Sequence, residues 1–195
     1  WPGFGPQKNR ALELATGDWV LSLDADERLT PTLRSEILTA IHHSAKIDCF
    51  AIPRLSWYCG RFIRHSGWSP DYVDRLFKRG TARFSDDLVH ERLIPEGTVA
   101  KLENAMLHFS FMNYSQVLQK LDRYSTASAE QAFAQGKTSS PLKAVLHGIW
   151  AFIRTYFIRA GFLDGSQGFA LAISNGQGTY YRYIKLWHLH QEARK

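Results

Sequence analysis

Two aspartates separated by a single residue, Asp24 and Asp26, follow directly on a short apolar run at residues 19–23. Carboxylate oxygens are the ligands that hard divalent cations such as Mg²⁺ and Mn²⁺ prefer in proteins. If the run is a buried strand of an open α/β sheet, both side chains stand at its carboxyl end, where such sheets bind ligands. The pair then has the chemistry to hold a cation that neutralises a departing diphosphate. The alternative is a solvated turn, because an Asp-x-Asp triplet is short and common.

The flanking sequence predicts the elements that hold these aspartates in place. Residues 7–16 have a short apolar face and end at Gly17, as a helix does. Thr30 and Pro31 suit the N-cap and the first position of a second helix, which the apolar spacing extends to about His42. Further strands are predicted at residues 49–56, 72–78 and 98–108, and the aromatic stretch 57–72 is predicted to be a loop or a loose hairpin.

The second half of the chain is predicted to be helical. One helix is expected at about residues 115–135, and residues 142–161 are almost continuously apolar and aromatic. A last helix is expected at about residues 166–190, where Gly176 and Gly178 should weaken the middle. We therefore expect three parts: a mixed α/β domain (1–135), a Gly- and Ser-containing linker (136–141) and a basic helical region (142–195).

Positive charge is concentrated in the C-terminal quarter of the chain. Residues 142–195 carry seven Lys and Arg against two Asp and Glu, whereas residues 1–141 carry 17 against 16. Residues 142–161 approach the length of a membrane span, but Arg154 lies inside them, and a central Arg costs about 2.5–3.5 kcal/mol. We therefore expect an amphipathic helix that lies on an anionic membrane surface. The alternative is a helical hairpin packed against the first domain or a dimer partner.

Composition also narrows the partners and the compartment. Nucleic acid is not an expected partner, because no nucleic-acid-binding motif is found and the basic residues lie among long apolar runs. The two cysteines, Cys49 and Cys59, match no zinc spacing, so we expect ordinary thiols in a reduced, cytoplasmic chain. The opening residues show no secretory signal and have the composition of a loop inside a domain, which predicts an N-terminally incomplete chain.

Several motifs carry a resemblance to a known family. QKNRA at residues 7–11 and ATGDWVLSLDADE at residues 15–27 resemble the family 2 glycosyltransferases of the GT-A fold. Within that family the chain looks most like the lipopolysaccharide core heptose β-1,4-glucosyltransferases. The likeness continues along nearly the whole chain, in GWSPD (67–71), DRLFKR (74–79), VHE (89–91) and GFLDG (161–165). It implies an α/β, Rossmann-like GT-A fold whose first strands precede this chain.

The resemblance also implies a reaction. The expected enzyme is inverting and moves a hexose, expected to be glucose, from a UDP-sugar to a lipid-linked oligosaccharide acceptor. That acceptor is expected to be the inner-core heptose of lipopolysaccharide. Mn²⁺ or Mg²⁺ is the implied cofactor, and the implied location is peripheral, on the cytoplasmic face of the inner membrane. The alternative is a non-catalytic membrane-surface binding protein that keeps the fold.

Donor-side roles follow from positions in the family's motifs. Asp26 is expected to be the principal metal ligand, and Asp24 to contact the ribose or the metal. His108 ends a strand-like run and is expected to complete the metal shell, with a core or loop histidine as the alternative. Phosphate or donor contact is expected from basic and amide side chains, unless they are ordinary surface residues: Lys8, Asn9, Arg10 and Arg75.

Acceptor-side roles follow in the same way. Glu91 matches the acidic residue that deprotonates the acceptor hydroxyl as it attacks the anomeric carbon. The alternative is a surface glutamate paired with Arg92 or Arg75. His90 is expected to orient Glu91 or to touch the acceptor. Four aromatic residues are candidates for an acceptor platform, unless they simply pack in the core: Trp57, Tyr58, Trp68 and Tyr72.

Overall fold

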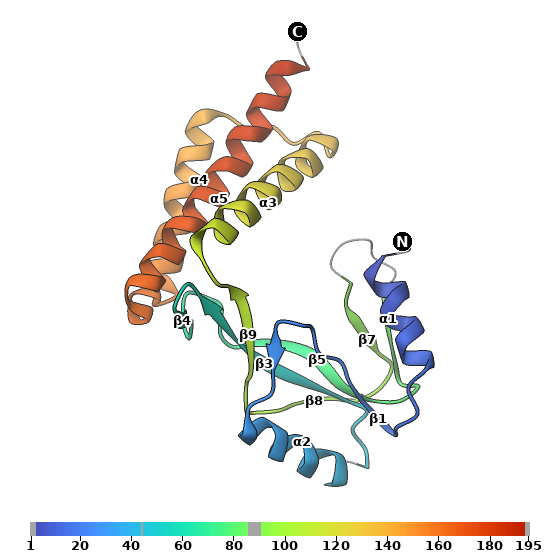
Figure 1. The fold of residues 1–195 in the computed structure, drawn as a ribbon. Coiled ribbons are helices and arrows are strands. Elements are labelled where there is room, and N and C mark those ends of the chain that lie inside the picture. The colour runs from blue at the N-terminus through green and yellow to red at the C-terminus, as the bar shows by residue number, and fades with distance from the viewer. Residues whose placement is uncertain (1–2, 44, 86–90, 194–195) are drawn as a thin grey trace. The chain divides into compact units, whose positions relative to one another are not determined.

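The computed structural model describes residues 3–43, 45–85 and 91–193. The chain folds into two compact units (Figure 1). Unit 1 consists of Trp1–Leu55 and Pro70–His108, and unit 2 consists of Ser56–Ser69 and Phe109–Lys195. The helix expected at residues 115–135 therefore belongs to the same unit as the C-terminal helices, and the expected linker at 136–141 lies inside unit 2.

A mixed β-sheet forms the frame of unit 1. Its strands are β1 (Trp19–Leu21), β2 (Glu27–Arg28), β3 (Cys49–Tyr58), β5 (Asp71–Lys78), β8 (Val99–Lys101) and β9 (Met106–Phe111). The order is β1-β5-β3-β9-β2, with β8 paired in parallel to β3. Strand β5 runs antiparallel to both β1 and β3, and β2 runs antiparallel to β9. The strands predicted at 49–56 and 72–78 are thereby confirmed.

Strand β1 is shorter and less buried than the apolar run predicted. It covers only Trp19–Leu21, all half-buried, and Leu23 is 40% exposed. The physical reason is its position at the end of the sheet order, where β5 is its neighbour. The chain then leaves the sheet through Ser22, whose N–H donates to the carbonyl of Arg75 at 2.8 Å. The acidic residues thus follow an end strand of the sheet.

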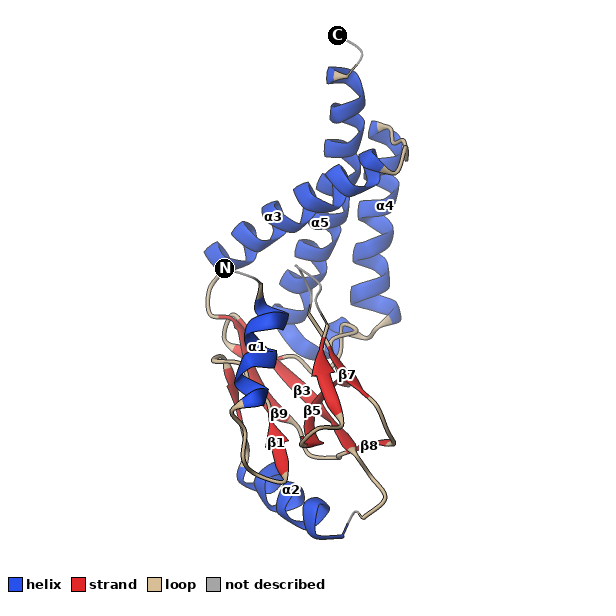
Figure 2. Cartoon of the chain, turned by 90° about the vertical axis from the view of Figure 1, so that its right-hand side faces the viewer, coloured by secondary structure: helices blue, strands red, loops and turns tan. Residues whose placement is uncertain are grey.

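Helix α2 (Pro31–His43) covers one side of the sheet and closes the main core of unit 1 (Figure 2). Its first turn is capped as expected, because the N–H of Leu33 donates to the Thr30 hydroxyl at 3.1 Å. Leu33 and Ile37 turn inward, one helical turn apart. They pack in a buried cluster with sheet side chains that include Phe50, Ile52, Leu76 and Met106.

Helix α1 (Phe4–Glu13) begins earlier and ends earlier than the predicted helix at 7–16. It packs through Leu12 on a second cluster that contains Phe77 and Phe84. Phe84 belongs to a two-stranded sheet that was not predicted, formed by β6 (Ala82–Phe84) and β7 (Leu93–Pro95). These strands are three residues each, too short to show an alternating pattern in sequence.

The predicted strand at 98–108 is two strands, β8 and β9. The chain turns between them because the carboxylate of Glu36, on α2, accepts the backbone N–H groups of Glu103 and Asn104 at 2.7 and 2.9 Å. The region 57–72 contains a real but very short hairpin. There β4 (Arg61–Phe62) pairs with the end of β3 across a turn at Cys59 and Gly60, both with positive φ.

Three long helices make up most of unit 2. They are α3 (Tyr114–Ala134), α4 (Pro141–Ile153) and α5 (Gly165–Glu192), and α5 packs against both others (Figure 1). Asn113 and Ser140 cap α3 and α4 by accepting backbone N–H groups at 3.0 and 3.2 Å. The apolar stretch predicted at 142–161 leaves α-helical geometry early. It continues through a π-helical turn, η1 (Arg154–Ile158), before a 3₁₀ turn, η2 (Gly161–Asp164).

Helix α5 runs without a break through Gly176 and Gly178, the two glycines expected to weaken its middle. Gly176 faces Gly148 of α4, and a Cβ added to either would lie 3.1 Å from the carbonyl oxygen of the other. Both are buried. The absence of side chains therefore lets the two backbones approach closely, which compensates for the low helix propensity of glycine. Across the described ranges, we find no helix with the length and hydropathy needed to span a membrane.

Candidate active site

Asp24 lies between two cations in the turn that follows strand β1. Its Oδ1 accepts a hydrogen bond from Lys8 Nζ at 3.0 Å, and its Oδ2 accepts one from Arg75 Nη2. Burial by itself would raise the pKa of Asp24. The charge of Arg75 and the hydrogen bonds from Lys8 and Arg75 outweigh it and hold that pKa below the ordinary value of 3.8. The two cations therefore favour the ionised form of Asp24, and each of its carboxylate oxygens accepts a hydrogen bond from one of them.

Glu27 is the buried carboxylate of this cluster of charged side chains. Its side chain is fully buried, and its Oε1 lies 2.6 Å from Arg75 Nη2 and 3.8 Å from Arg54 Nη1. Its Oε2 accepts the backbone N–H of Asp24 at 3.0 Å, and its own N–H donates to the Asp24 carbonyl at 3.0 Å. Glu27 thus closes the turn 24–27, which carries both aspartates.

Arg75 is buried with these two carboxylates. Only 7% of the residue is exposed. Burial would lower the pKa of Arg75, but the adjacent charges of Glu27 and Asp24 raise it. The sequence analysis considered Arg75 for phosphate or donor contact, and in the structure its Nη2 donates to Glu27 and Asp24. Glu27 was not singled out, and its one signal was its place as the last acid of Asp-Ala-Asp-Glu.

Asp26 and His108 meet on the other side of the same turn. The β2–β9 pairing sets Glu27 opposite His108, which brings the neighbouring Asp26 Oδ2 to 3.3 Å from His108 Nε2. Half of the Asp26 side chain is exposed. The structure therefore brings together the carboxylate and the imidazole expected as ligands of one cation.

These donors fit a cation that is shared with a substrate. Within the described residues, no group of three or more His, Cys, Asp and Glu side chains is arranged to hold a metal ion. Mg²⁺ commonly binds through one or two carboxylates while substrate phosphates and waters fill its other positions, and imidazole suits Mn²⁺. Asp26 with His108 matches that type of partial protein site.

Lys8 links the expected base to Asp24. Lys8 Nζ lies 3.0 Å from Glu91 Oε1 as well as 3.0 Å from Asp24 Oδ1. The Glu91 side chain is 17% exposed and forms an ion pair with Lys8, whereas Arg92 and Arg75 were the partners considered from sequence. His90, the expected neighbour of this base, lies outside the described residues.

Asn9 and Arg10 have different neighbours from Lys8. The amide of Asn9 donates to the Phe84 carbonyl at 3.0 Å and accepts the Phe84 N–H at 2.8 Å. This pair of bonds ties α1 to β6, which fixes the helix that carries Lys8. Arg10 is exposed and donates to Gln7 on its own helix at 3.3 Å. Lys8 is therefore the residue of QKNRA that reaches the acidic cluster.

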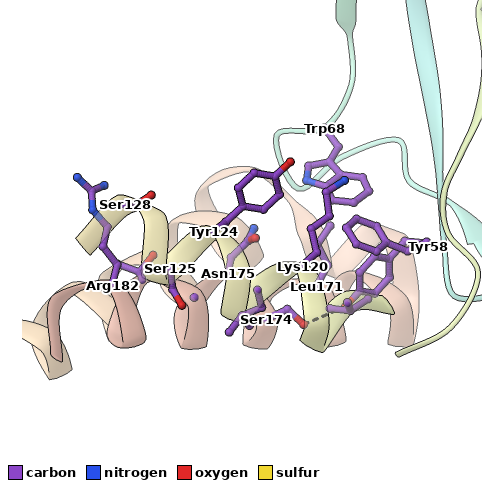
Figure 3. A pocket seen from close by; sticks show the side chains of 15 residues that line it. Tyr58, Trp68, Lys120, Tyr124, Ser125, Ser128, Leu171, Ser174, Asn175 and Arg182 are labelled. Atoms are coloured by element: carbon purple, nitrogen blue, oxygen red, sulfur yellow. Dashed lines mark hydrogen bonds between the residues drawn. The ribbon is translucent and has the colours of Figure 1, made fainter. Parts of the chain in front are cut away.

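The four aromatic residues expected to form an acceptor platform have different neighbours in the structure. Trp68 and Tyr58 line a hollow of about 460 Å³ in unit 2, between α3 and α5 (Figure 3). Trp57 packs edge-on against Phe62 with ring centroids 4.8 Å apart. Tyr72 belongs to unit 1, where Lys101 Nζ lies 4.5 Å from its ring centroid.

The hollow that contains Trp68 is mostly apolar with polar groups along its length. Trp68 stacks on Phe111 with centroids 6.0 Å apart, and the Tyr58 hydroxyl shares a 2.9 Å hydrogen bond with Ser174 (Figure 3). Lys120 and Arg182 line the same hollow. Aromatic faces beside hydroxyl and cationic groups are suited to a sugar or an anionic ligand.

The GFLDG motif has a structural role in unit 2. Asp164 is 1% exposed, and its carboxylate accepts the backbone N–H groups of Arg64 and His65 at 3.0 and 2.9 Å. The Ser66 hydroxyl donates to the same carboxylate at 3.3 Å. Asp164 therefore anchors the loop that precedes Trp68 to the start of α5.

Comparison with known proteins identifies the family of the first half of the chain. Residues 1–95 match the model of the family described as Glycosyl transferase family 2. The chain is a member of glycosyl transferase family 2. Membership implies the GT-A fold, and the mixed α/β architecture of unit 1 is consistent with it. The matched region contains Lys8, Asp24, Asp26, Arg75 and Glu91.

Relatives of this family 2 glycosyltransferase extend over both units. The lipopolysaccharide core biosynthesis glycosyltransferase LpsC of Rhizobium meliloti (strain 1021) is 29% identical over 97% of this chain and 71% of its own length. Uncharacterized glycosyltransferases of Rickettsia typhi and Rickettsia prowazekii are 28% and 27% identical, over 100% and 95% of this chain and 70% and 68% of their own lengths. The C-terminal helices are thus aligned with these relatives, and an enzyme is favoured over a non-catalytic binding protein.

Proposed function

We propose that this glycosyltransferase transfers a hexose, with glucose as the first candidate, from a UDP-sugar to the inner-core heptose of lipopolysaccharide, with inversion at the anomeric carbon. The observation that carries the proposal is the cluster in which Lys8 holds both Asp24 and Glu91 beside the Asp26–His108 pair. The name of LpsC and the heptose glucosyltransferase motifs support the lipopolysaccharide acceptor.

The donor side is assigned to the turn 24–27. Asp26 and His108 would hold Mn²⁺ or Mg²⁺ together with the donor's diphosphate, and a bound cation would neutralise the charge that develops on the leaving nucleoside diphosphate. Glu27 and Arg75 keep the turn in one geometry from within the core. Asp24 stays ionised between Lys8 and Arg75 and can accept a hydrogen bond from the donor's ribose.

The acceptor side is assigned to Glu91. In an inverting displacement the acceptor hydroxyl forms a bond to the anomeric carbon as the bond from that carbon to the diphosphate breaks. A carboxylate within reach takes the hydroxyl proton, so that the products are the glycoside and the nucleoside diphosphate. Lys8 contacts Glu91 at 3.0 Å and so orients the carboxylate that would receive the proton.

Transfer to a defined acceptor tests this function. Lipopolysaccharide that ends at the inner-core heptoses is incubated with the protein, Mn²⁺ or Mg²⁺, and separate UDP-hexoses, and the product is read by mass spectrometry and linkage analysis. Addition of one hexose to heptose, with inverted anomeric configuration, is the expected result. Transfer only to a different sugar, or only from another nucleotide sugar, would reject the proposed donor and acceptor while leaving the family intact.

A further inference from the structure

Helix α4 turns a face of large apolar side chains toward solvent. Six residues that recur every three or four positions are 36–68% exposed: Leu142, Val145, Leu146, Ile149, Trp150 and Ile153. The opposite face of the helix, with Ala144 and Gly148, is buried. A helix on the surface of a water-soluble unit ordinarily places polar residues outward. An exposed apolar stripe of this size therefore marks a contact surface.

The apolar surface continues through the two turns that follow α4. Phe157, Ile158, Phe162 and Leu163 are 49–62% exposed. These turns are connected to α4 by ring contacts, because Tyr156 lies 5.6 Å from Phe152 and 6.3 Å from Phe162, measured between ring centroids. We call the ten exposed residues the α4 face: Leu142, Val145, Leu146, Ile149, Trp150, Ile153, Phe157, Ile158, Phe162 and Leu163.

Basic residues accompany this face, and acidic residues are absent from its sequence. Residues 131–163 contain no Asp or Glu. They contain four basic residues, Lys137, Lys143, Arg154 and Arg159, all of them exposed. The next acid, Asp164, is buried and bound to backbone N–H groups, so it does not offset them at the surface.

The charge of the whole unit has the same sign. Unit 2 carries twelve Lys and Arg against four Asp and Glu, whereas unit 1 carries twelve against fourteen. The positive charge of this chain is therefore concentrated in the unit that bears the α4 face. Such a unit is attracted to a negatively charged surface over about a Debye length, roughly 8–10 Å at physiological ionic strength.

We propose that the α4 face docks on the surface of an anionic lipid bilayer. Trp150 and the phenylalanines would lie at the level of the headgroups, and Lys143 and Arg154 would contact lipid phosphates. A second copy of the chain fits less well, because pairing two such faces would bring two strongly basic units together. A bilayer supplies both the apolar depth and the negative charge. The proposal goes beyond the transfer reaction, since docking does not depend on turnover.

Flotation with lipid vesicles tests the docking. The protein is mixed with vesicles of phosphatidylcholine alone or with phosphatidylglycerol added, and the fraction that floats with lipid is measured at low and high salt. We expect binding to the phosphatidylglycerol vesicles that weakens as salt rises. The double variant Leu146→Glu/Trp150→Glu should reduce the partition coefficient about tenfold or more, because charged groups replace the apolar anchors.

A matched control uses the same substitution on another helix of the same unit. Leu118 on α3 is 59% exposed and lies outside the α4 face, so Leu118→Glu should float like the wild type. The charge variant Lys143→Glu/Arg154→Glu leaves the apolar residues in place and should lose only the preference for phosphatidylglycerol. Thermal melting by circular dichroism identifies any variant that has lost its fold.

Contact with lipid can also be measured in the wild-type protein, with no substitution in the α4 face. Lipids brominated along their acyl chains should quench tryptophan fluorescence in the wild type, and Trp150→Phe should remove most of that quenching. No flotation of the wild type, or equal losses for Leu118→Glu and the double variant, would overturn the proposal. It would also be overturned if the wild type sedimented as a dimer that Trp150→Glu converted to a monomer.

Discussion

The guanidinium of Arg75 donates a 2.6 Å hydrogen bond to the carboxylate of Glu27, and both side chains are buried in the sheet of unit 1. The same nitrogen also binds Asp24. One buried ion pair therefore sets the geometry of the acidic turn and connects the stability of the fold to the candidate site.

Replacing Glu27 with Gln should destabilise the protein severely. The substitution leaves the buried Arg75 charge with only the partly exposed Asp24 as partner, and breaking a buried ion pair costs about 3–5 kcal/mol. Urea unfolding followed by tryptophan fluorescence measures the loss. Glu192→Gln is the control, because Glu192 is exposed and pairs with His188 at 3.3 Å on the helix surface, where about 0.5 kcal/mol or less is expected. Equal losses for the two variants would contradict the central role of Glu27.

The Asp24 carboxylate should make stability depend on acid pH. Its pKa lies below the ordinary 3.8 in the folded protein. A lowered pKa means that its contribution to stability is complete above the unfolded-state pKa and is lost as pH falls through the folded-state value. The difference in unfolding free energy between the wild type and Asp24→Asn should therefore shrink from about pH 4 downward. A difference that stays constant over this range would contradict the assignment.

Asp26 and His108 should act together in cation binding. Asp26→Asn and His108→Ala should each raise the Mn²⁺ concentration needed for half-maximal transfer by about tenfold or more. Paramagnetic resonance of Mn²⁺ in the presence of UDP measures binding separately from turnover. The double variant should be little worse than either single variant if both side chains serve one ion. Additive losses, or transfer that needs no divalent cation, would contradict a shared site.

Glu91→Gln should reduce kcat by about 10²–10⁴ while the KM for the donor changes little, because the amide cannot accept the hydroxyl proton. Glu96→Gln is the matched control, since Glu96 is exposed and follows β7 a few residues along the same segment. Steady-state kinetics with varied UDP-hexose separate the two constants. A Glu91→Gln enzyme with unchanged kcat would assign the base elsewhere.

The features predicted correctly from the sequence are those that depend on residues close together in the chain. Thr30 lies three residues before the N–H that it caps, and Leu33 and Ile37 are one helical turn apart, so α2 was visible in a short window. Strands β3 and β5 were predicted, at residues 49–56 and 72–78, for the same reason. Local periodicity and capping are encoded within a few residues and need no knowledge of the rest of the chain.

The features that sequence missed depend on residues far apart in the chain. Glu27 becomes central only because Arg75 reaches it from β5, and the predicted strand at 98–108 breaks because Glu36 captures two N–H groups there. For the candidate site, the family motifs predicted which residues take part. Only the fold shows Lys8 as the shared partner of Asp24 and Glu91, because two segments far apart in the chain meet at its ammonium group.

The glycine pair between α4 and α5 provides a test of packing in unit 2. Gly176→Ala should destabilise the protein by about 1–3 kcal/mol, although alanine is the better helix former by about 1 kcal/mol, because the added methyl meets backbone across the crossing. Its Cβ would lie 3.1 Å from the Gly148 carbonyl oxygen, so the two helix backbones would have to separate by a few tenths of an ångström.

Gly178, two residues further along α5, is the control for this prediction. A Cβ there would lie 3.6 Å from the Leu121 side chain, an ordinary van der Waals distance. Gly178→Ala should therefore be neutral or stabilise the helix by about 0.5–1 kcal/mol. Opposite signs in denaturant unfolding would show that Gly176 is required for the close helix crossing, whereas stabilisation by both substitutions would show that α4 and α5 do not pack backbone to backbone.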